Sequence, residues 1–128
     1  MIKVVFCLRR LPQLSRAQFQ DYWRSVHAPL VRERAAILGI RRYVQCHTVD
    51  HASTAMMQAS RGCGDDYDGI AELWFDSAET MFARVDDARV RQAGYELLED
   101  ERRFIDLPRS PLFLVREHEF VAPERSWS

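Results

Sequence analysis

Residues 15–33 read SRAQFQDYWRSVHAPLVRE, and this stretch is the clearest amphipathic helix in the sequence. Ser15 followed three residues later by Gln18 is a capping-box start. Apolar residues then recur at spacings of three and four, which predicts a single stripe facing the core. The members of this stripe are Phe19, Trp23, Val26 and Leu30. His27 lies beside Val26 at the edge of the stripe, so we expect it at the margin of the core.

Pro29 interrupts this helical pattern two residues after His27. Proline disfavours helical geometry at the preceding Ala28 and removes one backbone donor, so we expect the helix to kink or break directly after His27. A break beside an inward-leaning imidazole predicts a pocket there. The structural alternative is a core histidine that donates to a carbonyl freed by Pro29, and spacing alone does not choose between the two because periodicity marks a core face.

Length and composition indicate one globular domain of ordinary type. The chain has 128 residues, of which 47% are hydrophobic and 29% charged, and we expect a single domain over residues 1–121 with a tail at 122–128. The net charge of -1 gives no electrostatic reason to expect nucleic acid or a membrane surface as a partner. The apolar run at 4–8 is too short for a spanning helix. Three cysteines without CxxC spacing predict free thiols and a cytoplasmic location.

The remaining elements follow from local periodicity and turn residues. Strands are expected at residues 2–9, 40–48, 67–75 and 112–120, and further helices at 77–85 and 88–105. Residues 50–66 lack periodicity and predict a long loop insertion, with room for a helical turn around 55–59. The order strand, helix, strand, strand, helix, strand indicates an α+β fold of the ferredoxin-like βαββαβ type. Such a fold has a four-stranded antiparallel sheet with helices on one face.

The second face of this expected sheet is also apolar. It carries Val44, Cys46, Ile70 and Trp74, and an apolar face of this size predicts a covering partner, most simply a second subunit in a homodimer. Asp68 and Glu72 share that face of the third strand. Two carboxylates could serve acid–base chemistry, but a salt bridge to Arg42 at the subunit interface explains them equally.

His27, Tyr43 and His47 are the candidate catalytic residues. Tyr43 and His47 lie four residues apart on one strand and therefore point to the same face, about 13 Å from each other. An imidazole can abstract and return a proton at neutral pH, and a phenol can donate to a developing enolate oxygen. A metal site is the competing interpretation, from Cys46, His47, Asp50, His51 and Cys63. Their spacing matches no zinc signature, so we expect no metal.

Several blocks of the chain together have a familiar order. They are Leu8-Arg9, Ser15 with Phe19, Tyr22-Trp23, His27-Ala28-Pro29-Leu30, Gly39-Ile40 with Tyr43, and YDGIAELWF at 67–75. In this order they resemble the EthD family of small proteins. The resemblance implies two ferredoxin-like protomers whose sheets face each other in a dimeric α/β barrel. It also implies a cavity between sheet and helices in each protomer, often used for cofactor-free chemistry on cyclic or polyketide-like carbonyl compounds.

Among characterised enzymes of this family, the chain is similar to the methylmuconolactone methylisomerases at His27, at Tyr43 and along the third strand. The resemblance implies that His27 and Tyr43 line an active site. Those enzymes have a cysteine where this chain has Leu73, so their substrate does not carry over. They also have a second histidine before the third strand, for which His47 and His51 are the candidates.

The hypothesis is a cofactor-independent isomerase, cyclase or dehydratase that acts on a small cyclic or aromatic carbonyl compound through an enolate. His27 would be the general acid or base and Tyr43 the donor to the enolate oxygen. Phe19, Trp23 and Leu73 would form the walls of the substrate pocket. Two alternatives stay open: a cofactor-free monooxygenase of the same fold, and a small-ligand-binding accessory protein without catalysis.

Overall fold

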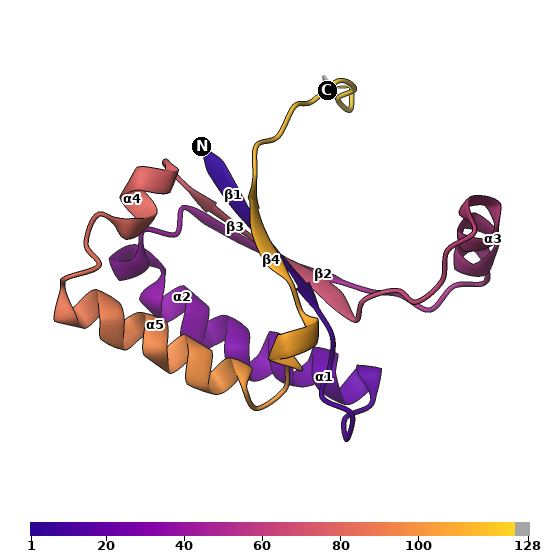
Figure 1. Cartoon of the computed structure of the whole chain (residues 1–128), viewed down its shortest axis with the longest axis horizontal. Coiled ribbons are helices and arrows are strands. Elements are labelled where there is room, and N and C mark those ends of the chain that lie inside the picture. The colour runs from indigo at the N-terminus through magenta and orange to yellow at the C-terminus, as the bar shows by residue number, and fades with distance from the viewer. Residues whose placement is uncertain (125–128) are drawn as a thin grey trace.

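A four-stranded antiparallel sheet forms the centre of the protein, whose computed structural model describes residues 1–124 (Figure 1). The strands are β1 (Ile2–Leu8), β2 (Arg42–His47), β3 (Gly69–Phe75) and β4 (Leu112–Val115), in the spatial order β2-β3-β1-β4. Each neighbouring pair is antiparallel. This order, with the helices between the strands, is the ferredoxin-like α+β fold, and the predicted fold class is confirmed.

β4 is shorter than the strand predicted at 112–120, because β1 has too few residues at its start to pair with the rest of that segment. Val115 lies opposite Lys3, and β1 itself begins at Ile2, so the ladder runs out of partner residues there. The residues that follow, Arg116 to Glu119, are polar and continue as extended chain without strand pairing.

The helices pack on one face of the sheet. The first helical region consists of α1 (Arg16–Tyr22), a π-helical turn η1 (Trp23–His27) and α2 (Ala28–Leu38). The second half of the chain supplies α4 (Ala78–Phe82), α5 (Ala88–Glu101) and a 3-10 turn η2 (Leu107–Arg109). Figure 1 shows α2 and α5 running side by side along the sheet. None of the helices within residues 1–124 is long and apolar enough to cross a membrane.

The predicted break after His27 is wrong, and the irregularity lies one turn earlier. Pro29 is the second residue of α2, but His27 and Ala28 before it keep helical backbone angles, so the helix continues through it. The helix widens instead, with the Ala28 amide donating to the Trp23 carbonyl across five residues. The extra residue in this turn shifts the helical phase. His27 is therefore 5% exposed, whereas Val26, predicted to face the core, is 43% exposed.

Residues 50–66 are not a plain loop, because they contain the ten-residue helix α3 (Ala52–Arg61). The His51 ring nitrogen Nδ1 accepts a hydrogen bond from the Ser53 amide, and Gly62 ends the helix with a φ of 66°. Ala52, Ala55, Met56 and Ala59 recur at helical spacing along α3, but no residue of the helix is buried. Figure 1 shows α3 extending from the ends of β2 and β3, away from the other helices.

The core lies between the helices and the inner sheet face, and aromatic rings dominate it. Phe19 is fully buried, with its ring centroid 5.6 Å from that of Trp23 and 5.4 Å from that of Phe104. Trp23 also packs directly on Gly69 of β3, where an added Cβ would lie 2.4 Å from the indole ring. Glycine is therefore required at position 69 for this helix–sheet approach.

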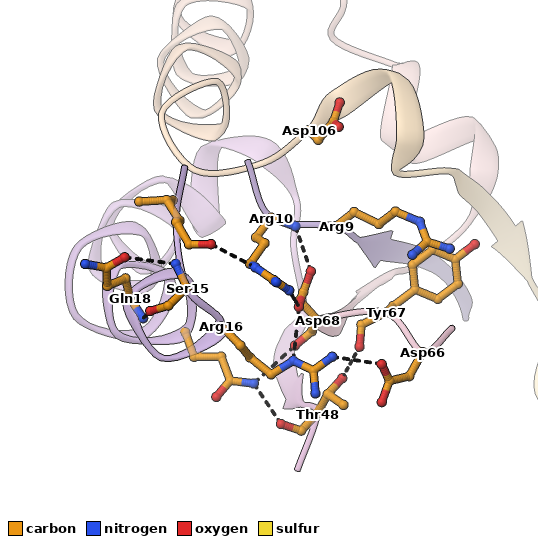
Figure 2. Close-up of polar contacts among 12 residues, drawn as sticks. Arg9, Arg10, Ser15, Arg16, Gln18, Thr48, Asp66, Tyr67, Asp68 and Asp106 are labelled. Carbon is orange, nitrogen blue, oxygen red and sulfur yellow. Dashed lines mark hydrogen bonds and ion pairs between the residues drawn. The ribbon is translucent and has the colours of Figure 1, made fainter. Parts of the chain in front are cut away.

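Asp68 is buried on the helix side of the chain and does not share an interface role with Glu72, which corrects the sequence interpretation. Its carboxylate accepts hydrogen bonds from the Arg10 amide at 2.8 Å, the Arg10 guanidinium at 2.6 Å and the Arg16 guanidinium at 3.0 Å (Figure 2). Burial by itself would raise the pKa of Asp68, but these hydrogen bonds hold it below its ordinary value. Asp68 thus fixes the start of α1 against β3.

The outer face of the sheet is partly covered by charged side chains of the same chain. Trp74 is only 8% exposed, because the Lys3 amine lies 4.8 Å and the Arg42 guanidinium 4.5 Å from its ring. Lys3 also pairs with Glu72 at 2.7 Å, a partner that the sequence had suggested for Arg42. The Trp74 indole donates to Glu117 at 2.7 Å. The apolar character of this face is therefore lower than the sequence predicts.

Candidate active site

A small cavity of about 50 Å³ lies between the helices and the inner face of the sheet. Its walls are mostly apolar and comprise Phe6, Leu8, Trp23, Val31, Ala71, Leu73, Leu97 and Ile105. Three ionisable side chains from three separate elements complete the lining: His27 from the π-helical turn, Tyr43 from β2 and Glu101 from the end of α5. An apolar cavity into which a small number of polar groups converge is typical of a ligand-binding or catalytic site.

His27 is held by a buried carboxylate. Its Nδ1 lies 2.7 Å from Oδ2 of Asp100, which is 6% exposed and comes from α5. The other oxygen of Asp100 accepts a hydrogen bond from the Tyr22 hydroxyl at 2.6 Å. With a carboxylate as its acceptor, Nδ1 carries the hydrogen of the neutral ring, and Nε2 is left to accept a proton. The arrangement is an oriented imidazole base.

The electrostatic balance at His27 favours the neutral ring. Burial lowers the pKa of His27, and this effect exceeds the opposing influence of the Asp100 carboxylate. The net pKa therefore lies below the ordinary value of about 6.5. At neutral pH the imidazole is unprotonated, which is the state that a general base requires.

The side-chain amide of Gln45 links Tyr43 to His47 at the end of β2. The Gln45 side chain donates to the Tyr43 hydroxyl at 2.8 Å and to the Trp23 carbonyl at 3.0 Å. Its carbonyl oxygen lies 2.8 Å from Nε2 of His47. Because the Tyr43 oxygen accepts from Gln45, its own hydrogen is free to donate to a ligand. Burial raises the pKa of Tyr43, so the phenol keeps that hydrogen at neutral pH.

Glu101 differs from the other acidic side chains of α5 because it faces the cavity. Burial, followed by repulsion from the neighbouring Asp100 carboxylate, raises the pKa of Glu101 to about 7. The same carboxyl group contributes to the raised pKa of Tyr43, which places these two cavity groups within electrostatic reach of each other. At neutral pH Glu101 is divided between its acid and its carboxylate, so it can both give and take a proton.

The structure brings together four of the six residues that the sequence analysis proposed for the site. His27, Tyr43, Trp23 and Leu73 line the cavity. Phe19 lies behind Trp23 in the core and does not reach the cavity wall. His47 stacks on Trp23 with ring centroids 4.5 Å apart and lies outside the lining. Burial and the charge of Arg24 lower the pKa of His47, so its ring is neutral at pH 7.

Asp100 and Glu101 were not predicted from the sequence, although a signal for them was present. They fall between the apolar Leu97 and Phe104 at helical spacings of three and four, which places all four on one side of a helix. Gln45 lies between Tyr43 and His47 on β2 and shares their face by the strand period. Its bridging role depends on side-chain geometry that the sequence does not give.

The residues of the competing metal interpretation are dispersed. Cys46 points to the outer face, where its thiol lies 3.5 Å from Glu72, while His51 caps α3. Within residues 1–124, no three His, Cys, Asp or Glu side chains gather in a way that could hold a metal ion.

Known proteins with the same fold include members of one family. A model of the EthD domain matches residues 11–108, and no curated protein is significantly similar to the chain. The crystal structure of an ethyl tert-butyl ether D (EthD) family protein from Bacillus halodurans superposes with a TM-score of 0.60 at 19% identity, covering 92% of this chain and 99% of that one. An EthD-like protein from Ralstonia eutropha gives 0.58 at 21% identity, covering 98% and 95%.

A third structure, from Bacteroides fragilis, is described as a dimeric protein of unknown function with a ferredoxin-like fold. It superposes with a TM-score of 0.56 at 8% identity and covers 91% of this chain and 95% of its own. At these identities the superpositions establish a shared fold. The domain match spans well over half of the sequence. The chain therefore belongs to the EthD family.

Proposed function

We propose that the protein is a cofactor-independent enzyme that removes a proton beside the carbonyl group of a small cyclic or aromatic compound and passes through an enolate. The observation that carries this proposal is the neutral His27 imidazole, held by Asp100 and lining an apolar cavity together with the Tyr43 phenol. A base and a hydrogen-bond donor on one small apolar cavity are the two groups that enolisation needs.

In the proposed mechanism, Nε2 of His27 takes the proton from the carbon next to the carbonyl group. Negative charge then develops on the carbonyl oxygen, and the Tyr43 hydroxyl donates to that oxygen. Asp100 stabilises the imidazolium formed at His27, because its carboxylate lies 2.7 Å from Nδ1. The surrounding apolar walls exclude water and strengthen both interactions.

A ring-sized substrate requires the cavity to enlarge. The cavity of about 50 Å³ has room for one or two waters, since a water takes about 30 Å³ in the liquid. Tyr43 borders a second, larger hollow of about 270 Å³ whose lining includes Arg32, Arg41 and Arg42. We propose that substrate enters from this hollow when the Tyr43 ring moves, and that the arginines favour substrates with negative charge.

The test follows the exchange of carbon-bound protons in D2O by proton NMR. The probe is α-angelica lactone, a five-membered β,γ-unsaturated lactone with acidic protons beside its carbonyl group. Wild-type protein should accelerate deuterium uptake at this carbon. His27→Asn keeps an amide that can donate to Asp100 but removes the base, and it should reduce the rate by about 10²–10⁴-fold.

Two other results would favour the alternatives. Oxygen consumption with the same probe, measured with an electrode, would identify a cofactor-free oxygenase. Binding of the probe without exchange, unaffected by His27→Asn, would identify a ligand-binding protein without catalysis.

We also propose that the protein acts as a homodimer through the outer face of its sheet. Ile70 and Val44 are only half-buried on this face, and Phe113 of β4 is 50% exposed. A second copy that packs its sheet on these residues would remove them from water. The dimeric description of the Bacteroides fragilis protein is compatible with this assembly.

A cytoplasmic location is part of the same proposal. Cys7, Cys46 and Cys63 are free thiols, and the latter two are exposed. Exposed free thiols persist in a reducing compartment and oxidise outside it. Fractionation of the native host, with the protein detected by antibody, tests the location directly.

A further inference from the structure

We propose that Glu101 is a second proton-transfer residue of this site, and that the protein therefore moves a proton between two carbons of an unsaturated cyclic carbonyl compound. This inference rests on the proposed function and narrows it to allylic isomerisation. It assigns to Glu101 the delivery of a proton to a second carbon of the substrate. The substrate class is a β,γ-unsaturated ketone or lactone.

The first support is the position of Glu101. It lies at the last residue of α5 and shares the cavity lining with His27, which comes from the π-helical turn, and Tyr43, which comes from β2. The three groups thus approach the same space from three elements. A planar ring between them would meet a base and an acid at different atoms, which an allylic shift requires.

The second support is the lack of a structural role for this carboxyl group. Other acidic side chains near it have partners: Asp100 binds His27 and Tyr22, Glu99 pairs with Arg102 at 2.6 Å, and Glu96 pairs with Arg34. Within residues 1–124, the Glu101 carboxyl group accepts no side-chain or backbone hydrogen bond. No buried side-chain oxygen within residues 1–124 lacks a partner, so the Glu101 oxygens are open to solvent or to a ligand in the cavity that they line.

The third support is the protonation state. Burial and the Asp100 carboxylate raise the pKa of Glu101 to about 7, while burial lowers that of His27. Slightly below pH 7 the site therefore holds a neutral imidazole and a protonated carboxyl group together. Two titrating groups with pKa values moved in these directions match a base and an acid.

The proposed reaction balances as follows for α-angelica lactone. Nε2 of His27 takes a proton from the α carbon, a double bond forms between the α and β carbons, and the original β,γ double bond opens. The Glu101 carboxyl group donates its proton to the γ carbon, which gives the α,β-unsaturated lactone. The imidazolium at His27 then loses its proton and the Glu101 carboxylate regains one through solvent, so no oxidant, reductant or cofactor is consumed.

The experiment separates deprotonation from delivery in the full-length protein. Proton NMR in D2O reports two rates with α-angelica lactone: deuterium uptake at the α carbon, and appearance of the α,β-unsaturated lactone. Glu101→Gln has nearly the same shape and cannot donate an acidic proton. It should keep α-carbon exchange within about twofold of wild type and lose isomerisation by about 10²-fold or more. Glu99→Gln, on the same helix but paired with Arg102 at the surface, should leave both rates unchanged.

The outcomes distinguish this inference from the proposed function. Wild-type exchange without isomerisation, or isomerisation by Glu101→Gln at the wild-type rate, would overturn the role of Glu101 and leave His27 as the base. Absence of exchange in wild-type protein would overturn the proposed function and the inference with it. The wild-type pH profile gives an independent readout: isomerisation should decline as pH rises through about 7, whereas α-carbon exchange should not.

Discussion

Asp100 determines what His27 can do. Without it, a histidine that is 5% exposed and packed against the Phe104 ring would be a neutral core residue with no partner to orient it. The 2.7 Å contact with Asp100 orients the ring and supplies a charge that would stabilise the imidazolium of the proposed proton transfer. The two residues are separated by 73 positions in the chain. No local pattern could pair them, and the buried position of His27 depends on the π-helical turn, which the sequence does not reveal.

Asp100→Asn should therefore weaken the base while leaving the fold intact. The amide occupies the same volume and can still accept from Nδ1, but it carries no charge, so the pKa of His27 should fall further. We expect α-carbon exchange with α-angelica lactone to drop by about 10–100-fold. Glu99→Gln serves as the control on the same helix. Exchange at the wild-type rate in Asp100→Asn would show that Asp100 has only a structural role.

Phe19 has no cavity contact and should contribute to stability only. Phe19→Ala removes a fully buried ring from between Trp23 and Phe104 and should lower the free energy of unfolding by about 3–5 kcal/mol. Phe120→Ala, at a position 92% exposed, is the control and should change little. Urea denaturation followed by tryptophan fluorescence gives both values. A loss below 1 kcal/mol for Phe19→Ala would contradict the described core.

At the scale of the elements, the order of strands and helices was predicted correctly, whereas the π-helical turn and helix α3 were not. The order of strands and helices was predictable, because periods of 2 and 3.6 residues are local properties. The π-helical turn was not predictable. Pro29 suggests an irregularity after His27, and the one extra residue of a π-helical turn has no sequence pattern of its own. This single residue exchanges Val26 for His27 on the buried face. Helix α3 was predicted as a loop because its residues are mostly small and polar, although Ala52, Ala55, Met56 and Ala59 recur at helical spacing.

The end of α5 should make stability depend on pH in a direction opposite to that of Asp68. For Glu101 the folded-state pKa of about 7 lies above the unfolded value of about 4.3, so the folded state binds more protons between them. Stability should accordingly fall as pH rises through this window. Glu101→Gln removes this loss and should unfold at higher urea than wild type at pH 8 but not at pH 4. Equal differences at both pH values would contradict the raised pKa.

The Asp68 cluster contributes the reverse dependence. Its folded-state pKa is lower than its ordinary value, so its contribution to stability is present at neutral pH and is lost as pH falls through the folded pKa. Asp68→Asn should therefore destabilise the protein at pH 7 and have a smaller effect in strong acid. This cluster joins the start of α1 to the residue before β3 (Figure 2).

At the scale of the whole molecule, the proposed dimer predicts a mass of twice the 15.0 kDa protomer by light scattering at micromolar concentration. Ile70→Glu places a charge on the outer sheet face, where an unpaired buried carboxylate is costly, and should yield protomers or aggregate. Met56→Glu on α3, at a position 75% exposed, is the matched control and should keep the wild-type mass. A wild-type protomer mass would contradict the assembly.

The fold and the cavity together support one central claim, that a neutral His27 acts as the base on a carbonyl compound. The most direct measurement is the rate of α-carbon deuterium exchange of α-angelica lactone across pH 4–9, for wild type and His27→Asn. We expect the wild-type rate to rise with an apparent pKa below the ordinary histidine value of about 6.5 and then to reach a plateau, and we expect no such rise in His27→Asn. Equal rates for the two proteins at every pH would contradict the claim.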